Sequence, residues 1–129
     1  MIEVVAALII DNNKFMICQR PAFKARPLLW EFPGGKLEKG ETEEEALVRE
    51  CREELDVTLE VSSLYTDVSF NYPDIDIHLS LYKSRIKEGT PKLLEHSNLK
   101  WITPSELGLY DFCPADCIII KKLKKEKAL

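Results

Sequence analysis

Three glutamates in one short segment, Glu50, Glu53 and Glu54, are the residues of this sequence best suited to chemistry. On an α-helix, which turns about 100° per residue, positions i, i+3 and i+4 share a face, with neighbouring Cβ atoms about 5–6 Å apart. The three carboxylates would therefore converge on one point. Acids in the last turn of a helix also oppose its dipole, at roughly 0.3–1 kcal/mol each. Because a bound cation would offset this cost, the spacing indicates a metal site.

Mg²⁺ is the cation that best fits these ligands. It binds through one or a few carboxylates and keeps positions for water and substrate phosphates, whereas Ca²⁺ takes more protein oxygens, and the sequence has no EF-hand loop for it. Mn²⁺ is the alternative ion. The neighbouring Arg49 can pair with Glu53 or Glu45, each one turn away. The competing interpretation is a solvated acidic helix face held by salt bridges, with no ion.

The helix that must carry these residues has a recognisable start and end. Thr42 followed by Glu45 predicts a capping box, and the acids at 43–45 suit the positive end of the helix dipole. We expect the helix to end near Leu55. A separate apolar face should dock it on the core: Leu47, Val48, Cys51 and Leu55.

The same segment resembles the Nudix box, the signature of a hydrolase family. That pattern is G-x5-E-x7-R-E-U-x-E-E-x-G-U, with U a bulky apolar residue. Here it runs Gly35, Glu41, Arg49, Glu50, Cys51, Glu53, Glu54, Asp56 and Val57. All the charged positions match, while Cys51 replaces a larger apolar residue. Asp56 replaces a glycine that would end the helix in a left-handed conformation, which Asp tolerates better than most residues.

The resemblance extends over nearly the whole chain and is nearest to MutT-like nucleoside triphosphate pyrophosphohydrolases, especially those acting on CTP and modified deoxycytidine triphosphates. It rests on further segments: 1–10, 29–36, Glu95-His96, Trp101 and 113–116. It implies one Nudix domain over residues 1–129. The implied fold is an α/β (α+β) class α/β/α sandwich, with a mixed β-sheet between helices.

The resemblance also implies roles in the hydrolysis of a nucleoside triphosphate to a monophosphate and pyrophosphate. The backbone carbonyl of Gly34 would join the three glutamates as a metal ligand. Glu95 would complete a second metal position or act as the base, a role for which Glu50 and Glu53 are the other candidates. Arg49 would orient the helix by pairing with Glu41 or Glu53.

Substrate contacts are expected from residues outside the box. By resemblance, Arg20 would bind phosphate or base and Lys36 phosphate, while Phe32 would either stack on the base or belong to the core, as would Trp30. An ionised Asp116 accepts hydrogen bonds only, which suits the exocyclic amine of cytosine. The alternative role for Asp116 is an acid in the first turn of a helix.

Three functions follow as hypotheses. The first is a cytidine-type triphosphate pyrophosphohydrolase acting on CTP, dCTP or 5-methyl-dCTP. The second is an 8-oxo-dGTP diphosphatase that removes oxidised purine nucleotides from the nucleotide pool. The third is a Nudix module that binds a nucleotide without hydrolysing it, and the intact set of glutamates argues against this one.

Composition supports a compact enzyme with a small-molecule substrate. The 129 residues are 45% hydrophobic and 31% charged, enough for a sizeable core. A net charge of −4 argues against a nucleic-acid duplex as partner. The terminal lysines, read as a solvated tail, do not change this expectation: Lys121, Lys122, Lys124, Lys125 and Lys127.

The remaining features exclude other classes. The four cysteines form no C-x-x-C pair, so we expect neither a disulfide framework nor a zinc site, and we expect no catalytic role for His78. No apolar run is long enough to span a membrane, and the chain enters a strand without a basic leader, which predicts a cytoplasmic protein. The sequence leaves open a monomer or a homodimer.

Periodicity predicts the order β, β, β, α, β, β, β, α. The expected strands are residues 4–10, 14–20, 30–32, 59–71, 75–86 and 100–102, the first two and the fourth and fifth forming hairpins. Pro33-Gly34-Gly35 reads as a loop. A helical turn at 104–107 and a helix from Pro114 to the lysines complete the chain.

Overall fold

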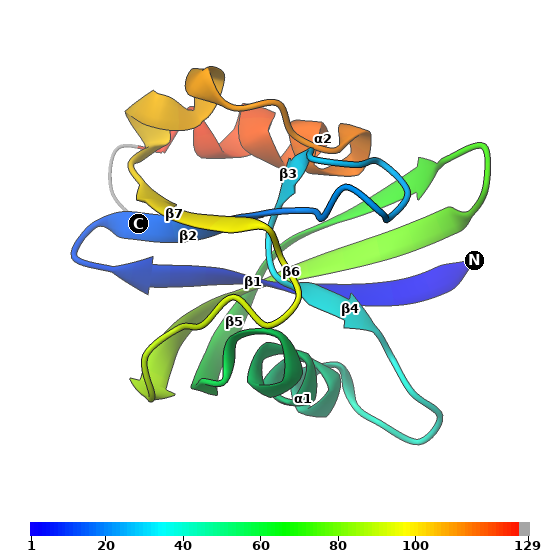
Figure 1. Ribbon diagram of the computed structural model, residues 1–129. Helices are drawn as coiled ribbons and strands as arrows, with labels where there is room; N and C mark the ends of the chain where they lie inside the picture. The colour runs from blue at the N-terminus through cyan, green and yellow to red at the C-terminus, as the bar shows by residue number, and fades with distance from the viewer. Residues whose placement is uncertain (127–129) are drawn as a thin grey trace.

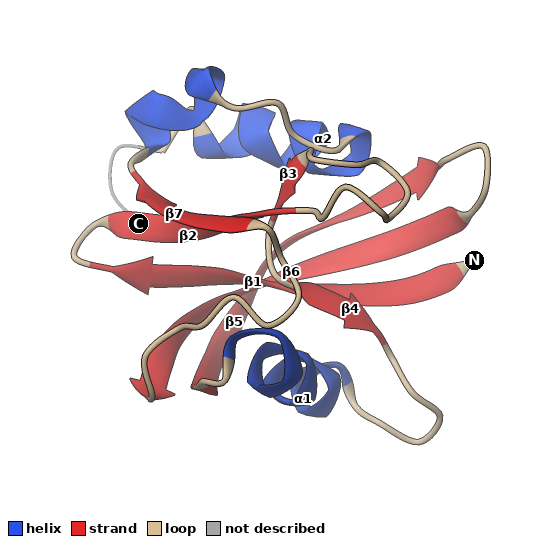
Figure 2. Cartoon of the chain, viewed as in Figure 1, coloured by secondary structure: helices blue, strands red, loops and turns tan. Residues whose placement is uncertain are grey.

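The structure is a computed structural model that describes residues 1–126, a mixed sheet with helices on its two sides (Figures 1 and 2). The strands are β1 (Ile2–Asp11), β2 (Lys14–Gln19), β3 (Trp30–Glu31), β4 (Gly34–Lys36), β5 (Thr58–Asn71), β6 (Asp76–Glu88) and β7 (Asn98–Ile102). The helices are α1 (Glu43–Leu55), the 3₁₀ helix η1 (Pro104–Leu109) and α2 (Pro114–Leu123).

The sheet has the strand order β3-β2-β1-β6-β5, with β4 beside β1 and β7 beside β2. β1 and β6 run parallel, with Val4 opposite Leu79, whereas the other pairs are antiparallel. The β5–β6 pair forms the long hairpin expected from residues 59–86. The predicted class, a mixed sheet between helices, is therefore confirmed.

β1 is buried on both faces, which explains why its sequence is almost continuously apolar. Val5, Ala7 and Ile9 pack in the cluster that includes the apolar face of α1. Ala6 and Leu8 pack on the opposite side, in the cluster that includes α2. Figure 1 shows α1 below the sheet and α2 above it. The central strand thus supports both layers of the molecule.

Helix α1 begins and ends as its sequence predicts. Thr42 Oγ1 accepts from the Glu45 backbone N–H at 3.2 Å, and Glu45 Oε1 accepts from the Thr42 N–H at 2.9 Å, completing the capping box. Asp56 ends the helix in the left-handed conformation (φ 55°, ψ 42°) and pairs with Lys92 at 3.0 Å. One detail was wrong: Ala46, rather than Val48, lies in the core beside Leu47, Cys51 and Leu55.

The order of elements differs from the prediction at one place. Pro33-Gly34-Gly35 was expected to be a loop, but residues 34–36 form the short strand β4, paired with Val4, Val5 and Ala6 of β1. Glycines suit this strand because the two backbones approach closely. A Cβ on Gly34 would lie 2.0 Å from the Val5 carbonyl oxygen. The predicted lysine tail begins in α2, and Lys127 lies outside the described residues.

Candidate active site

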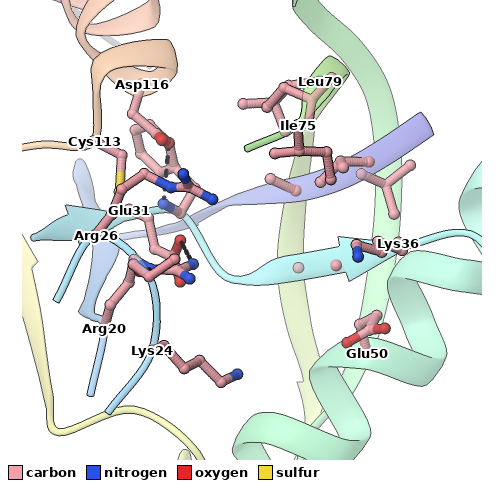
Figure 3. A pocket seen from close by; sticks show the side chains of 18 of the residues that line it. Arg20, Lys24, Arg26, Glu31, Lys36, Glu50, Ile75, Leu79, Cys113 and Asp116 are labelled. Atoms are coloured by element: carbon pink, nitrogen blue, oxygen red, sulfur yellow. Dashed lines mark hydrogen bonds and ion pairs between the residues drawn. The ribbon is translucent and has the colours of Figure 1, made fainter. Parts of the chain in front are cut away.

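A pocket of about 590 Å³ opens where β4, α1, the loop after β2, the β5–β6 hairpin and the start of α2 meet (Figure 3). Nine of the ten residues predicted for the site line it, and the exception is Arg49. The nine are Arg20, Phe32, Gly34, Lys36, Glu50, Glu53, Glu54, Glu95 and Asp116. The fold therefore gathers into one cavity residues as far apart in the sequence as Arg20 and Asp116.

One end of the pocket, here called the acidic end, is formed by Glu50, Glu53 and Glu54 of α1. Glu54 is the most buried of the three, with 8% of its surface exposed. Its Oε1 accepts a hydrogen bond from the Gly34 backbone N–H at 3.2 Å. This bond joins the end of α1 to β4 and fixes the position of the carboxylate relative to the sheet.

Glu50 lies directly against β4, and the glycine at position 35 permits the approach. A Cβ on Gly35 would lie 2.5 Å from the Glu50 carboxyl carbon and 2.6 Å from each of its oxygens. Any larger residue there would force the Glu50 side chain to move. The first glycine of the sequence signature thus makes room for one of its carboxylates.

Arg49 binds two acids of the acidic end, Glu50 and Glu53, and a third acid, Glu41, from the loop before α1. It forms a bidentate pair with Glu41, from Nε to Oε2 at 2.7 Å and from Nη2 to Oε1 at 2.9 Å. Its Nη1 donates to Glu50 at 3.0 Å and to Glu53 at 3.3 Å, and Nη2 also donates to the Lys36 carbonyl. Arg49 therefore connects the loop before α1 with the helix. The expected pairs with Glu41 and Glu53 are confirmed, while Glu45 serves the capping box instead.

The surroundings of Glu54 and Glu50 at the acidic end disfavour the ionised form of both side chains. Burial, and then the charge of Glu50, raises the pKa of Glu54 to about 9. Burial also raises the pKa of Glu50, although its bond to Arg49 acts in the opposite direction. An ion beside these carboxylates would reverse both shifts, since a nearby opposite charge favours the ionised form. The donor set, carboxylates in a partly closed pocket, fits a hard divalent cation.

The described residues contain no group of three His, Cys, Asp or Glu side chains close enough together to hold a metal. Nη1 of Arg49 contacts one oxygen of Glu50 and one oxygen of Glu53. A cation bound by all three glutamates would use their other oxygens or replace these contacts with Arg49.

The opposite end of the pocket, here called the Asp116 end, is formed by Arg26, Cys113 and Asp116 (Figure 3). Tyr72 belongs to it as well, since its hydroxyl contacts the backbone of Ala115, next to Asp116. Asp116 is 6% exposed, and its Oδ1 accepts from the Phe32 backbone N–H at 3.4 Å. Burial, and then the charge of Glu31, raises the pKa of Asp116 to about 8. The acceptor-only role predicted for Asp116 requires its ionised form, whereas the raised pKa favours a neutral carboxyl, which donates one hydrogen bond as well as accepting.

Arg20 is held by neighbours within the pocket. Its Nη1 donates to Glu31 at 2.9 Å and its Nε to the Ala25 carbonyl at 2.7 Å. The second oxygen of Glu31 lies 3.1 Å from Nε2 of His96, which is buried. Glu31 thus fixes the direction of Arg20, leaving Nη2 as the group best placed to contact a ligand.

The remaining predicted residues lie in different settings. Phe32 is buried and packs 6.1 Å from the Phe15 ring, so it is part of the core as well as of the pocket wall, whereas Trp30 is in the core only. Glu95 lies at the pocket and pairs with Lys24, which lowers its pKa. Lys36, the last residue of β4, lines the pocket near Glu50 (Figure 3).

Sequence reasoning missed six polar residues that line the pocket: Lys24, Arg26, Glu31, Tyr72, Asp74 and Cys113. They belong to four separate segments and share no spacing, so no local pattern indicated them. Glu31 and Cys113 did fall within segments that carried the family resemblance. The turn signal at Tyr72-Pro73-Asp74 located the hairpin but gave no indication that it would face the site.

The structure also gives the settings of His78, of the cysteines and of the helices. His78 lies between Glu3 at 2.8 Å and Asp67 at 2.7 Å and does not line the pocket. All four cysteines are free. Among residues 1–126, no helix is both long and apolar enough to cross a membrane.

Comparison with known proteins agrees with this architecture. The NUDIX domain pattern matches residues 1–123. Over 121 residues the chain is 39% identical to the CTP pyrophosphohydrolase of Escherichia coli (strain K12), covering 94% of this chain and 90% of that protein. It is 37% identical over 115 residues to the 8-oxo-dGTP diphosphatase of the same organism, covering 89% of each. The solution structure of the E. coli ORF135 protein superposes with a TM-score of 0.79 at 39% identity, covering 96% of this chain and 86% of that one.

The fold and the pocket define a hydrolase with a mixed sheet between helices and an acidic helix at its site. The chain belongs to the Nudix family. The expected family and the expected hydrolase class are both confirmed.

Proposed function

We propose that the chain is a Mg²⁺-dependent nucleoside triphosphate pyrophosphohydrolase of the cytidine type, producing a nucleoside monophosphate and pyrophosphate. The observation that carries the proposal is the pocket itself, which joins an acidic end suited to a metal with a second end suited to a base. Mn²⁺ is the expected substitute for Mg²⁺.

The acidic end holds the metal in this proposal. Glu50, Glu53 and Glu54 supply carboxylate oxygens, and Gly34 supplies its backbone carbonyl. Bound there, the cation would stabilise charge on the phosphate chain and lower the pKa of a bound water. The raised pKa of Glu54, about 9, supports this assignment because burial makes a lone carboxylate unfavourable at that point.

The chain's own residues orient the reactants. Arg49 keeps α1 and its glutamates against β4 without contacting the substrate. Glu50 accepts the proton of the attacking water, with Glu53 and Glu95 as the alternative bases. The water oxygen forms a bond to phosphorus, the bond to a bridging oxygen breaks, and pyrophosphate is released. Lys36 and Arg20 neutralise phosphate charge on either side of the acidic end.

The base is proposed to occupy the Asp116 end. Phe32 supplies an apolar wall there, and the neutral Asp116 both donates and accepts. Preference for a cytosine base is supported by the likeness to the CTP pyrophosphohydrolase. The second candidate, hydrolysis of 8-oxo-dGTP, is favoured by the likeness to the 8-oxo-dGTP diphosphatase and by a neutral Asp116, which also matches a purine edge with a donor and an acceptor.

We further propose that residues 1–129 act as one Nudix domain in the cytoplasm, as a monomer or homodimer, with a free nucleotide as its partner. The net charge of −4 supports a free nucleotide over a nucleic-acid duplex.

Pyrophosphate release tests the proposal. The purified chain is assayed with CTP, dCTP, 5-methyl-dCTP and 8-oxo-dGTP, with Mg²⁺ and with a chelator. We expect Mg²⁺-dependent release and the highest kcat/KM for a cytidine nucleotide. A preference of about tenfold or more for 8-oxo-dGTP would establish the second candidate instead. Binding without release from any nucleotide would leave only the non-catalytic module.

A further inference from the structure

The loop between β2 and β3 reaches across the pocket to the β5–β6 hairpin through one side chain, Arg26. Its guanidinium lies over the Tyr72 ring, 4.0 Å from the centroid. Its Nη1 donates to Asp74 at 2.9 Å, and this bond lowers the pKa of Asp74. Since all three residues line the pocket, the contact forms part of the pocket wall.

Tyr72 is itself fixed from two sides. Its hydroxyl oxygen accepts from the Ala115 backbone N–H at 2.9 Å, in the first turn of α2 and next to Asp116. Its ring packs on Phe70, with centroids 4.6 Å apart. Arg26 is therefore held against a ring that is tied to the helix carrying Asp116. Figure 3 shows Arg26 near Cys113 and Asp116, away from Glu50 and Lys36.

This fixation leaves hydrogen-bonding capacity unused. A guanidinium has five N–H donors in a rigid plane. Among residues 1–126, only Nη1 of Arg26 has a side-chain hydrogen bond, the one to Asp74. Nη2 and Nε are thus available to an acceptor in the pocket. The backbone of Arg26 has φ 54°, a left-handed conformation that is uncommon for a long side chain.

We propose that Arg26, held by Tyr72 and Asp74, is a specificity-determining residue that donates hydrogen bonds to acceptor atoms of the nucleobase. This inference rests on the proposed function. The phosphates of a nucleotide bound for hydrolysis must lie at the acidic end, so Arg26 faces the other end of the substrate. Cytosine presents O2 and N3 as neighbouring acceptors, and 8-oxoguanine presents O6 as an acceptor beside an N7 that carries a hydrogen. The neutral Asp116 complements either edge with a donor and an acceptor.

The test compares Arg26→Lys with the wild type on two substrates, CTP and ribose 5-triphosphate, which has no base. Lysine keeps the positive charge but loses the planar set of donors. We expect KM for CTP to rise about tenfold, because losing one hydrogen bond from a charged donor weakens binding by about that factor. The value of kcat should be nearly unchanged. KM for ribose 5-triphosphate should stay within about twofold. Arg85→Lys is the matched control, because Arg85 pairs with Glu60 on the surface outside this pocket.

A second variant distinguishes a loss of substrate contacts from a folding defect. Arg26→Asn suits the left-handed backbone, and its thermal midpoint reports whether the loop has lost stability. Equal increases in KM on both substrates would mean a phosphate contact or a purely structural role and would overturn the inference, as would an unchanged KM for CTP. If the wild-type chain releases no pyrophosphate from any nucleotide, the proposed function itself is overturned. This outcome is distinct from the one above, because it is measured on the wild type and not on the Arg26 variants.

Discussion

The two ends of the pocket are built in opposite ways. The acidic end comes from a single helix turn and a glycine strand next to it in sequence, all within residues 34–54. The Asp116 end comes from a loop, a hairpin turn and the start of α2, which lie far apart in the sequence. Each end buries a carboxyl with a raised pKa, about 9 for Glu54 and about 8 for Asp116.

The difference between the two ends is in what surrounds the buried acid. Glu54 has other carboxylates of the same helix beside it, and Glu50 contributes most to its shift after burial. Asp116 has Glu31 beside it and the cations Arg20 and Arg26 nearby. The carboxylates around Glu54 favour the binding of a cation. The arginines and aromatic rings near Asp116 favour hydrogen bonds to a polar ring such as a nucleobase. We infer that the reaction and the substrate preference are determined separately.

The largest effect should come from Glu54→Gln. Removing the charge takes away a proposed metal ligand, so kcat/KM should fall about 1,000-fold in the pyrophosphate-release assay. The metal-free thermal midpoint should stay the same or rise, because a neutral amide replaces a carboxyl whose charged form burial disfavours. Glu44→Gln, on the exposed first turn of α1, is the control and should retain activity. Full turnover by Glu54→Gln would contradict the metal assignment.

Arg49→Lys should have a smaller effect at the same end. Lysine cannot reproduce the bidentate pair with Glu41 while also reaching Glu50, so the glutamates would be less well held. We expect the Mg²⁺ concentration for half-maximal activity to rise about 10- to 100-fold, as is usual when the support of a metal ligand is lost. Arg52→Lys is the control, because Arg52 bonds to Thr58 outside the pocket. An unchanged Mg²⁺ titration would show that Arg49 does not position the ligands.

Gly35→Ala tests the close approach of Glu50. The added Cβ would lie 2.5 Å from the Glu50 carboxyl carbon, and the side chain can turn away at little cost in stability. Activity should therefore fall about tenfold, while the thermal midpoint changes by no more than a few degrees. At Gly108 an added Cβ meets nothing within 4 Å, which makes Gly108→Ala the control. Normal activity of Gly35→Ala would mean that Glu50 functions in another position.

The smallest expected effect concerns Asp116 and pH. The pKa of Asp116 is raised from 3.8 to about 8 on folding, so the native state binds this proton more tightly than the unfolded state. Its contribution to stability is complete below about pH 4 and is lost as the pH rises toward 8. Between pH 5 and 8, the free energy of unfolding of the metal-free wild type should therefore fall relative to that of metal-free Asp116→Asn. The difference between the two should change by at least about 1 kcal/mol.

Urea denaturation across this pH range measures the difference. Asp11→Asn, at an exposed position, is the control and should show no comparable trend. A constant difference between wild type and Asp116→Asn would show that Asp116 stays ionised in the native state. An ionised Asp116 would then only accept hydrogen bonds, as cytosine recognition requires.

Sequence reasoning predicted the acidic end well because its information is local. A capping box at Thr42, a left-handed Asp56 and glutamates spaced for one helix face depend on residues within a few positions of one another. β4 was missed because two glycines after a proline read as a turn, and only the pairing with β1 makes them a strand. Arg26 could not be found because its partners, Tyr72 and Asp74, are brought near by the whole fold.

The close packing of Gly34 against the Val5 carbonyl limits which parts of the pocket can accept substitutions. It fixes β4, and with it the bond to Glu54, on the most buried strand, so the reacting groups cannot shift without disturbing the core. Among residues 1–126, the loop bearing Arg26 makes no hydrogen bond to that strand, and Tyr72 lies in the turn that precedes the pairing of β6 with β1 at Ile77. New substrates are therefore accessible through a few loop substitutions, while the bond that is cleaved stays the same.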